Sequence, residues 1–284
     1  MKISITRSGQ ACGATVQGVD LSVELDSSTI ATLREAWLAH KVLVFPGQKL
    51  TTEDLERFTL YFGPFGHDPF IEPIVGHPHV IAVQRAADET GPIFADSAWH
   101  TDWSFQKTPP AGTCLYGITI PPQGGDTLFA NQQLALQKMP ATLRSKLEGK
   151  RALHTARLAY SPQGVYGDTA KQTMSMKFSP SDEATAEQYH PLIRIHPETG
   201  EEVLFGALGY MLGVEGMPED QALELLSELH NWQTREEFQY RHRWEANSLL
   251  MWDNRSVLHC AQGGYDGYAR LLHRTTIGER ARAS

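Results

Sequence analysis

The sequence predicts a mostly β fold with flanking helices, and the architecture that suits it best is a double-stranded β-helix, or jelly roll. Short β-branched and aromatic runs bounded by proline and glycine recur along the chain, whereas only three segments have helical periodicity. No internal repeat, low-complexity tract or linker divides the 284 residues. We therefore expect residues 1–284 to form a single domain.

Three segments have the spacing of amphipathic helices. In residues 28–40 the apolar side chains fall three and four positions apart. Residues 51–63 begin with threonines and two acids and end at Gly63, which are ordinary helix start and stop signals. Residues 218–230 begin with a proline and two acids, and their leucines recur at helical spacing. We expect these helices to pack outside the sheets.

The predicted strands are short apolar runs that end at turn residues. They are 41–45, 80–83, 113–120, 192–195, 203–205, 248–252 and 271–276. The strands 192–195 and 203–205 flank a turn-like segment, so we expect them to form a hairpin. Apart from the run at 80–83, residues 63–99 are rich in proline, glycine, aspartate and histidine, so we expect long loops there.

Charge and composition limit the partners and the compartment. The net charge of -8 gives no positive field that would hold nucleic acid or an anionic membrane. The three cysteines lie far apart and form no CxxC pair, which argues against a disulfide framework or a cysteine zinc site. The N-terminus lacks an apolar signal segment, and no run of about 18 apolar residues could span a bilayer. We expect a cytoplasmic protein.

A histidine and a carboxylate two residues apart, His100 and Asp102, would face the same side of a strand. With 12 histidines and 33 acids in the chain, such a pair is expected by chance, and His196 and Glu198 form another. A hydrogen-bonded polar pair is the simpler interpretation. The second pair lies in the expected hairpin turn, where both side chains would be solvated. The first is flanked by aromatic residues that can exclude water, so it is the candidate site.

A third ligand, His259, follows an apolar run late in the chain. Two histidines and one carboxylate form a facial triad, which leaves coordination positions open for a chelating co-substrate and O₂ at Fe(II). Closed structural zinc sites do not have this composition. The alternative is a jelly-roll binding protein in which the three residues form a polar core network or hold zinc.

Five motifs resemble the taurine dioxygenase family, whose Fe(II)- and 2-oxoglutarate-dependent enzymes include 2,4-dichlorophenoxyacetate dioxygenases and alkylsulfatases. In the family's order they are KVLVFPGQ (41–48), WHTDWSF (99–105), PPQGGDT (121–127), WDNRSVLH (252–259) and HRTT (273–276). The resemblance covers most of the chain. It implies iron bound by His100, Asp102 and His259, with 2-oxoglutarate and O₂ as co-substrates, and a homodimer or homotetramer.

The resemblance also implies which residues bind the co-substrate and the substrate. Arg270, eleven residues after His259, would bind the far carboxylate of 2-oxoglutarate, helped by Thr127 after the Gly-Gly-Asp. An arginine fork matches a carboxylate with two parallel hydrogen bonds. Arg274, four residues further on, would contact an anionic group of the substrate. Taken alone, either arginine would be interpreted as a surface or ion-pair residue.

Two acids depart from the family's pattern. Asp68 stands where taurine-type members carry a histidine that contacts the substrate, and Asp96 stands where relatives carry an asparagine. We assign both to the substrate site. A carboxylate repels an acid and suits an amine or a hydroxyl. Taurine itself is therefore not the expected substrate.

The sequence thus predicts a dioxygenase that hydroxylates a small anionic compound such as a sulfonate, an alkyl sulfate or an aryloxyalkanoate. If the hydroxylated carbon bears a heteroatom group, the product releases that group. An alternative keeps the same cofactors but hydroxylates or desaturates an amino acid or another metabolite. We expect no catalytic residue beyond the metal ligands.

Overall fold

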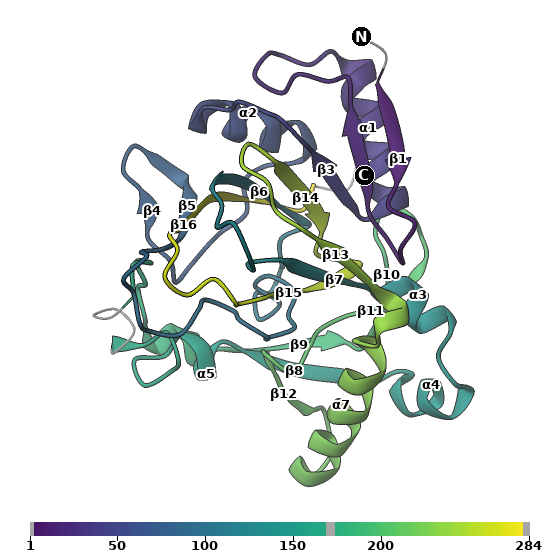
Figure 1. The fold of residues 1–284 in the computed structure, drawn as a ribbon. Coiled ribbons are helices and arrows are strands. Elements are labelled where there is room, and N and C mark those ends of the chain that lie inside the picture. The colour runs from purple at the N-terminus through teal and green to yellow at the C-terminus, as the bar shows by residue number, and fades with distance from the viewer. Residues whose placement is uncertain (1–2, 169–173, 281–284) are drawn as a thin grey trace.

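The computed structural model describes residues 3–168 and 174–280 (Figure 1). The helices are α1 (Ser27–His40), α2 (Thr52–Phe62), α3 (Gln132–Gln137), α4 (Ala141–Leu147), α5 (Arg157–Tyr160) and α7 (Glu219–Gln233), with short 3₁₀ turns η1 (Asp182–Thr185) and η2 (Glu236–Phe238). Within these described ranges, no helix combines the length and the apolar character needed to cross a bilayer.

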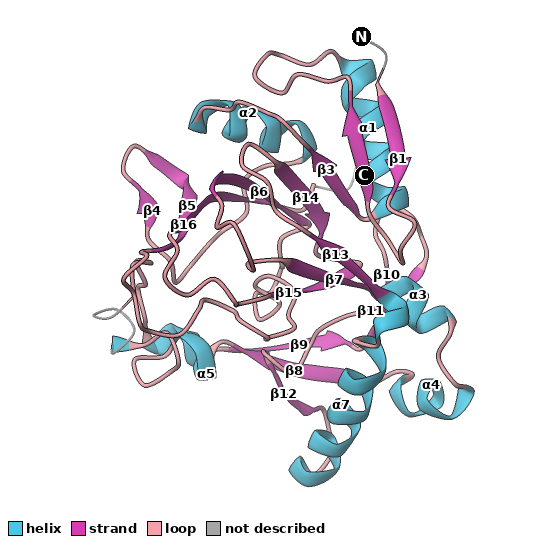
Figure 2. Cartoon of the chain, viewed as in Figure 1, coloured by secondary structure: helices cyan, strands magenta, loops and turns pink. Residues whose placement is uncertain are grey.

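The strands of the described residues form four sheets, and Figure 2 shows how the strands are arranged. They are β1 (Ser4–Arg7), β2 (Ala14–Gln17), β3 (Val42–Phe45), β4 (Pro73–Ile74), β5 (His77–Arg85), β6 (Gly112–Thr119), β7 (Thr127–Asn131), β8 (Arg151–Thr155), β9 (Glu187–Pro191), β10 (Ile193–Ile195), β11 (Glu202–Leu204), β12 (Met211–Val214), β13 (Gln239–His242), β14 (Leu249–Asp253), β15 (Val257–Ala261) and β16 (Arg270–Ile277).

The large sheet has the order β1-β2-β3-β14-β6-β16-β5-β4, and it packs against a smaller sheet of order β13-β7-β15. All neighbours are antiparallel except β2 and β3. A third sheet, β12-β8-β9, lies on the other side of the small sheet with α7 against it (Figure 1). The hairpin β10-β11 completes the set.

The central strands of the large sheet are buried on both faces, which explains their uninterrupted apolar sequences. In β3, Val42 and Val44 pack toward the small sheet, whereas Leu43 and Phe45 pack toward α1 and α2. The other face is covered by the apolar side of these helices, including Trp37. The helices therefore close the outer face and leave the space between the two sheets for the site.

Local signals set the helix boundaries as expected. The Asp26 side chain caps α1 by accepting from the Thr29 N–H, and Thr51 and Asp54 form a reciprocal capping box at the start of α2. The three predicted helices and seven predicted strands are confirmed, and the strand expected at 80–83 extends over all of β5. No local pattern predicted β7 or β15, which carry Thr127 and His259.

The expectation that His196 and Glu198 are both solvated is wrong for His196, whereas Glu198 is exposed. His196 is only 2% exposed, and its Nε2 lies 2.9 Å from Oδ2 of Asp253. Glu198 binds the guanidinium groups of Arg34 and Arg255. The turn places these side chains at the end of β14, beside the buried charges of Asp253 and Arg255, which need charged or hydrogen-bonding partners.

Gly112, at the start of β6, has no room for a side chain. A Cβ there would lie 2.5 Å from Cζ2 of Trp37 and 2.7 Å from the carbonyl oxygen of Trp252. We expect Gly112→Ala to lower the free energy of unfolding by about 1–3 kcal/mol through overpacking, measured by urea denaturation. Gly213→Ala is the matched control, because its nearest atoms lie 3.8 Å away. An equal loss in both variants would contradict this explanation.

Candidate functional site

Two histidines far apart in the sequence lie side by side. The His100 N–H donates to the carbonyl of His259 at 2.9 Å, and the His259 N–H donates back to the carbonyl of His100 at 2.8 Å. His259 belongs to β15 and is opposite Phe129 of β7, so the small sheet holds both histidines. Their ring centroids are 4.1 Å apart. Both rings are thereby directed to one place.

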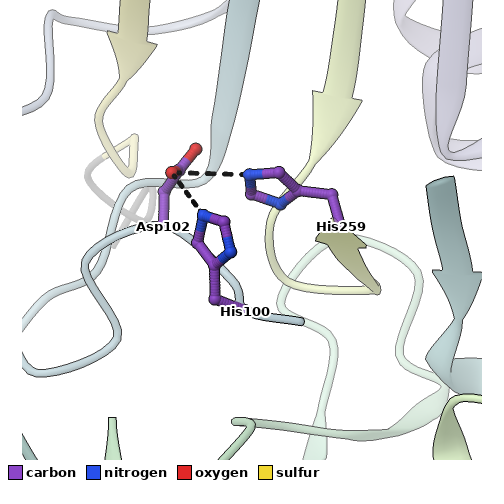
Figure 3. Close-up of side chains that lie close together, drawn as sticks. All are labelled: His100, Asp102 and His259. Atoms are coloured by element: carbon purple, nitrogen blue, oxygen red, sulfur yellow. Dashed lines mark ion pairs between the residues drawn. The ribbon is translucent and has the colours of Figure 1, made fainter. Parts of the chain in front are cut away.

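Asp102 joins the two rings from a turn. The strand geometry expected for His100 and Asp102 is wrong: only His100 forms a bridge, and the chain then turns, with Trp103 in the left-handed region at φ 49°. Oδ1 of Asp102 lies 3.6 Å from Nε2 of His259 and 3.9 Å from Nε2 of His100 (Figure 3). One ligand atom from each residue lies within 4.8 Å of the others.

A chain of buried hydrogen bonds orients the Asp102 carboxylate. Its Oδ2 accepts the hydroxyl proton of Thr113 at 2.6 Å, and Oγ1 of Thr113 accepts from Nδ2 of Asn254 at 2.9 Å. Trp252 donates in turn to Oδ1 of Asn254 at 2.8 Å. Because the Thr113 proton is committed to Oδ2, the other carboxylate oxygen stays directed at the histidines.

The three side chains hold the protonation states that a metal ion requires. Burial, together with the charge of His100, lowers the pKa of His259 to about 3. Burial also lowers the pKa of His100. For Asp102, burial alone would raise the pKa, but the neighbouring His259 and Arg274 bring it down to about 2. Near neutral pH the imidazoles are neutral and the carboxylate is ionised, so no proton competes with a cation.

An inner cavity adjoins the triad between the two sheets. It is lined by Val83, Phe94, Ala95, His100, Leu115, Thr127, Trp252, His259, Ala261, Arg270 and Arg274. The predicted residues Thr127, Arg270 and Arg274 are thus brought together with both histidines. Among the described residues, the buried Nε of Arg270 and the buried Nε of Arg274 have no hydrogen-bond partner. Two cationic donors are therefore available to an anion.

Arg270 and Thr127 are held in position by aromatic neighbours. Nη2 of Arg270 donates to the carbonyl of Gly125 at 3.1 Å, and its guanidinium lies 5.6 Å from the ring centroid of Tyr265. Gly125 has φ +71°, and a Cβ there would lie 3.3 Å from the Arg270 Nε. Oγ1 of Thr127 accepts from the indole of Trp244 at 3.0 Å, which leaves the hydroxyl proton free to be donated.

Asp68 lies against Arg274 and lines neither of the two cavities that adjoin His100. Its Oδ1 accepts from Nη2 of Arg274 at 2.8 Å and from the indole of Trp103 at 2.7 Å. Its Oδ2 accepts from the hydroxyl of Thr276 at 3.0 Å. Both carboxylate oxygens are occupied, so Asp68 is held against the predicted substrate arginine, and its own contact with the substrate stays a prediction.

A second cavity, the outer chamber, has a volume of about 440 Å³ and shares Phe94, Ala95 and His100 with the inner one. It is lined by Pro92, Ile93, Phe94, Ala95, Asp96, Ala98, His100, Leu158, Ala159, Tyr160, Val165, Tyr166, Gly209 and Tyr210. Asp96 lies at its exposed rim and accepts from the Gly263 N–H at 2.8 Å. Sequence reasoning missed the three tyrosines, because no motif surrounds them and their loops meet only in the folded chain.

The comparison with known proteins agrees with this geometry. The profile of the taurine catabolism dioxygenase TauD, TfdA family matches residues 4–276. The chain belongs to this family. It is 34% identical over 284 residues to the alpha-ketoglutarate-dependent 2,4-dichlorophenoxyacetate dioxygenase of Cupriavidus pinatubonensis, covering 94% of each chain.

Other members of the TauD/TfdA family are similar over nearly the whole length. The alpha-ketoglutarate-dependent sulfate ester dioxygenase of Pseudomonas putida is 31% identical over 93% of this chain and 86% of its own. A crystal structure of a taurine dioxygenase from Burkholderia xenovorans superposes with a TM-score of 0.80 at 32% identity, covering 98% of this chain and 92% of that one. The expected class, a 2-oxoglutarate-dependent dioxygenase, is confirmed.

Two histidines near the site should make the stability depend on pH. Burial lowers the pKa of His154 to about 3 and that of His242 to about 4, from 6.5. Below about pH 6.5 the unfolded chain takes up protons that the folded protein does not. The free energy of unfolding should therefore decrease as the pH is lowered. We expect the free energy of unfolding of metal-free protein to drop by about 2 kcal/mol per histidine between pH 7.5 and 5, measured in urea.

The control for this pH dependence is His154→Asn. Its slope of stability against pH should be smaller than that of the wild type, whatever its stability at pH 7.5. A stability that stays constant from pH 7.5 to pH 5 would show that the buried histidines are protonated in the folded protein.

Proposed function

We propose that this protein is an Fe(II)- and 2-oxoglutarate-dependent dioxygenase that hydroxylates a small anionic organic substrate. The observation that carries the proposal is the position of the triad His100, Asp102 and His259 beside a cavity with two unpartnered guanidinium N–H groups. Iron bound there would supply the reaction of 2-oxoglutarate with O₂ that yields succinate, CO₂ and a hydroxylated substrate.

The donor set suits iron. Nε2 of His100, Nε2 of His259 and Oδ1 of Asp102 are the three candidate ligand atoms. Oδ2 of Asp102 accepts from Thr113, whereas Nδ1 of His259 is buried and has no hydrogen-bond partner among the described residues. Nδ1 of His100 lies 2.8 Å from the carbonyl of Ala98, which fixes the ring. Two histidines and one carboxylate leave coordination positions open, as an oxygenase requires.

Arg270 and Thr127 would bind the far carboxylate of 2-oxoglutarate. The Arg270 Nε and the Thr127 hydroxyl proton both lack a partner among the described residues and belong to the same cavity as the triad. Burial lowers the pKa of Arg270, yet an arginine keeps its charge near neutral pH. A buried cation beside a free hydroxyl is suited to a dicarboxylate. The protein's contribution is to fix this co-substrate before the reaction begins.

The proposed substrate site lies at Arg274 and in the outer chamber. Arg274 keeps a free Nε and lines the inner cavity, so it can contact an anionic group. The relatives named above act on a sulfate ester and on 2,4-dichlorophenoxyacetate, which are compounds of this kind. Hydroxylation next to an ether or ester oxygen would release the heteroatom group. Oxidation of an amino acid with the same cofactors is the alternative, tested by the same substrate panel.

We also infer that the chain is one jelly-roll domain. The large sheet combines β1 and β2 from the start of the chain with β16 from its end, which supports a single unit. Two facing antiparallel sheets, with the ligands between them, are the arrangement of a double-stranded β-helix.

Removing the distal histidine should abolish metal binding. We expect anaerobic protein with Fe(II) and 2-oxoglutarate to develop a weak visible charge-transfer band that His259→Ala lacks. The control is His67→Ala, because His67 is exposed on a loop. A wild-type protein that is folded and iron-loaded yet shows no band would exclude 2-oxoglutarate chelation.

Removing the guanidinium of Arg270 should weaken co-substrate binding. Loss of a charge-assisted contact costs about 1.5 to 3 kcal/mol, so the Michaelis constant of Arg270→Ala for 2-oxoglutarate should rise about 10-fold to 150-fold. Succinate formation is the measurement, and Arg243→Ala is the control because Arg243 is exposed. An unchanged constant in Arg270→Ala would show that another residue binds the carboxylate.

A further inference from the structure

The arginine proposed to contact the substrate is already paired. Nη2 of Arg274 and Oδ1 of Asp68 are 2.8 Å apart, and the two side chains are only 5% and 10% exposed. Asp68 cannot easily turn away, because Trp103 and Thr276 donate to its two oxygens. A cation with a buried counter-ion presents little net charge to a ligand. An anionic group would therefore gain less at Arg274 than at an unpaired arginine.

The outer chamber offers a different kind of contact. Its walls include the rings of Phe94, Tyr160, Tyr166 and Tyr210. Burial raises the pKa of each of these tyrosines, so their hydroxyls stay neutral. The loop that carries Phe94 is held to the opposite wall, since the Ala95 N–H donates to the Tyr166 hydroxyl at 2.8 Å. The chamber is thus an assembled aromatic site.

The size and position of the chamber suit the reacting part of a substrate. An apolar cavity of about 150 Å³ can already hold benzene, and this one measures about 440 Å³. It reaches the triad directly, because His100 lines both cavities and its ring lies edge-on to Tyr210 with centroids 6.4 Å apart. A group bound here would lie beside the proposed metal. At the rim, the Asp96 carboxylate would repel a second negative charge.

We propose that the substrate is recognised mainly through an uncharged aromatic body that fills the outer chamber, and that Asp68 determines this specificity by neutralising Arg274. The inference rests on the proposed function, since it names the substrate class of the same site. A site of this kind differs in one consequence from a site that binds its substrate mainly through the substrate's negative charge. A compact anion without an aromatic body would be a poor ligand.

Three probes separate the aromatic body from the charge: phenoxyacetate has both, methoxyacetate has only the charge, and phenoxyacetamide has only the ring. Their dissociation constants are measured by calorimetry on anaerobic protein supplied with Fe(II) and 2-oxoglutarate. We expect phenoxyacetate to bind at least about tenfold more tightly than methoxyacetate, because ring burial is favourable. Phenoxyacetamide should bind within about fivefold of phenoxyacetate, because a neutralised arginine adds little.

Asp68→Asn tests the role of the ion pair. The substitution removes the nearer of the two carboxylates beside Arg274, whose Nη1 also lies 3.4 Å from Oδ1 of Asp102. With one of these charges gone, Arg274 should favour phenoxyacetate over phenoxyacetamide by about tenfold more than in the wild type. Asp88→Asn removes the same charge from an exposed position and should leave the ratio unchanged. A ratio in Asp68→Asn equal to that of the wild type would overturn the assignment of Asp68.

Gly209 gives a test that does not depend on the ion pair. A Cβ there would be 3.5 Å from the Trp99 carbonyl oxygen and 3.8 Å from the His100 Cβ, both ordinary contacts, so a larger side chain can be introduced beside His100. Gly209→Leu should weaken phenoxyacetate binding at least about tenfold, while methoxyacetate binding changes little. Gly209→Ala adds only a methyl group, so it is the matched control and should weaken phenoxyacetate binding less than Gly209→Leu does.

The outcomes that overturn the inference are distinct from those that overturn the proposed function. Methoxyacetate binding as well as phenoxyacetate, no binding of either aromatic probe, or unchanged phenoxyacetate binding in Gly209→Leu would each exclude aromatic recognition in the chamber. These are binding measurements. The proposed function fails instead if Fe(II) and 2-oxoglutarate never give succinate or the charge-transfer band.

Discussion

The two backbone hydrogen bonds between His100 and His259 are the constraint on which the site depends. They join a loop that follows the long segment after β5 to a strand near the end of the chain. Without these hydrogen bonds the two imidazoles would lie on separate elements, and nothing in the backbone would hold the rings next to each other. Because peptide hydrogen bonds have narrow geometry, the pair fixes the two backbones at a spacing from which both rings can reach one ion.

The rest of the molecule supports this pair from both sides. β7 holds β15 through a full register of antiparallel partners, and the large sheet supplies Thr113, which orients Asp102. The helices α1 and α2 contribute by covering the opposite face of the large sheet. His259, Thr127 and the two arginines therefore lie on paired strands, whereas the outer chamber is lined mainly by loops and by the short helix α5. This division suits a fixed reaction with a variable substrate.

The two arginines of the site differ in their charged partners. Arg270 has no carboxylate among its described hydrogen-bond partners, only the carbonyl of Gly125, and it remains available to an anionic co-substrate. Arg274 is balanced by Asp68 and lies close to Asp102. Two arginines four residues apart on one strand thus have different electrostatic roles. Their different partners, and not their residue type, make the difference.

The sequence by itself determined the class of the fold and the positions of the main helices and strands, because these follow from local periodicity and turn residues. It predicted the triad, Thr127 and Arg270 through motifs that resemble the TauD/TfdA family, and their roles stay predictions. Tertiary structure alone decided that Asp68 forms an ion pair with Arg274, that His196 is buried, and that three tyrosines line a chamber beside His100. These contacts join residues far apart in the chain, and no local pattern encodes which partners folding will bring together.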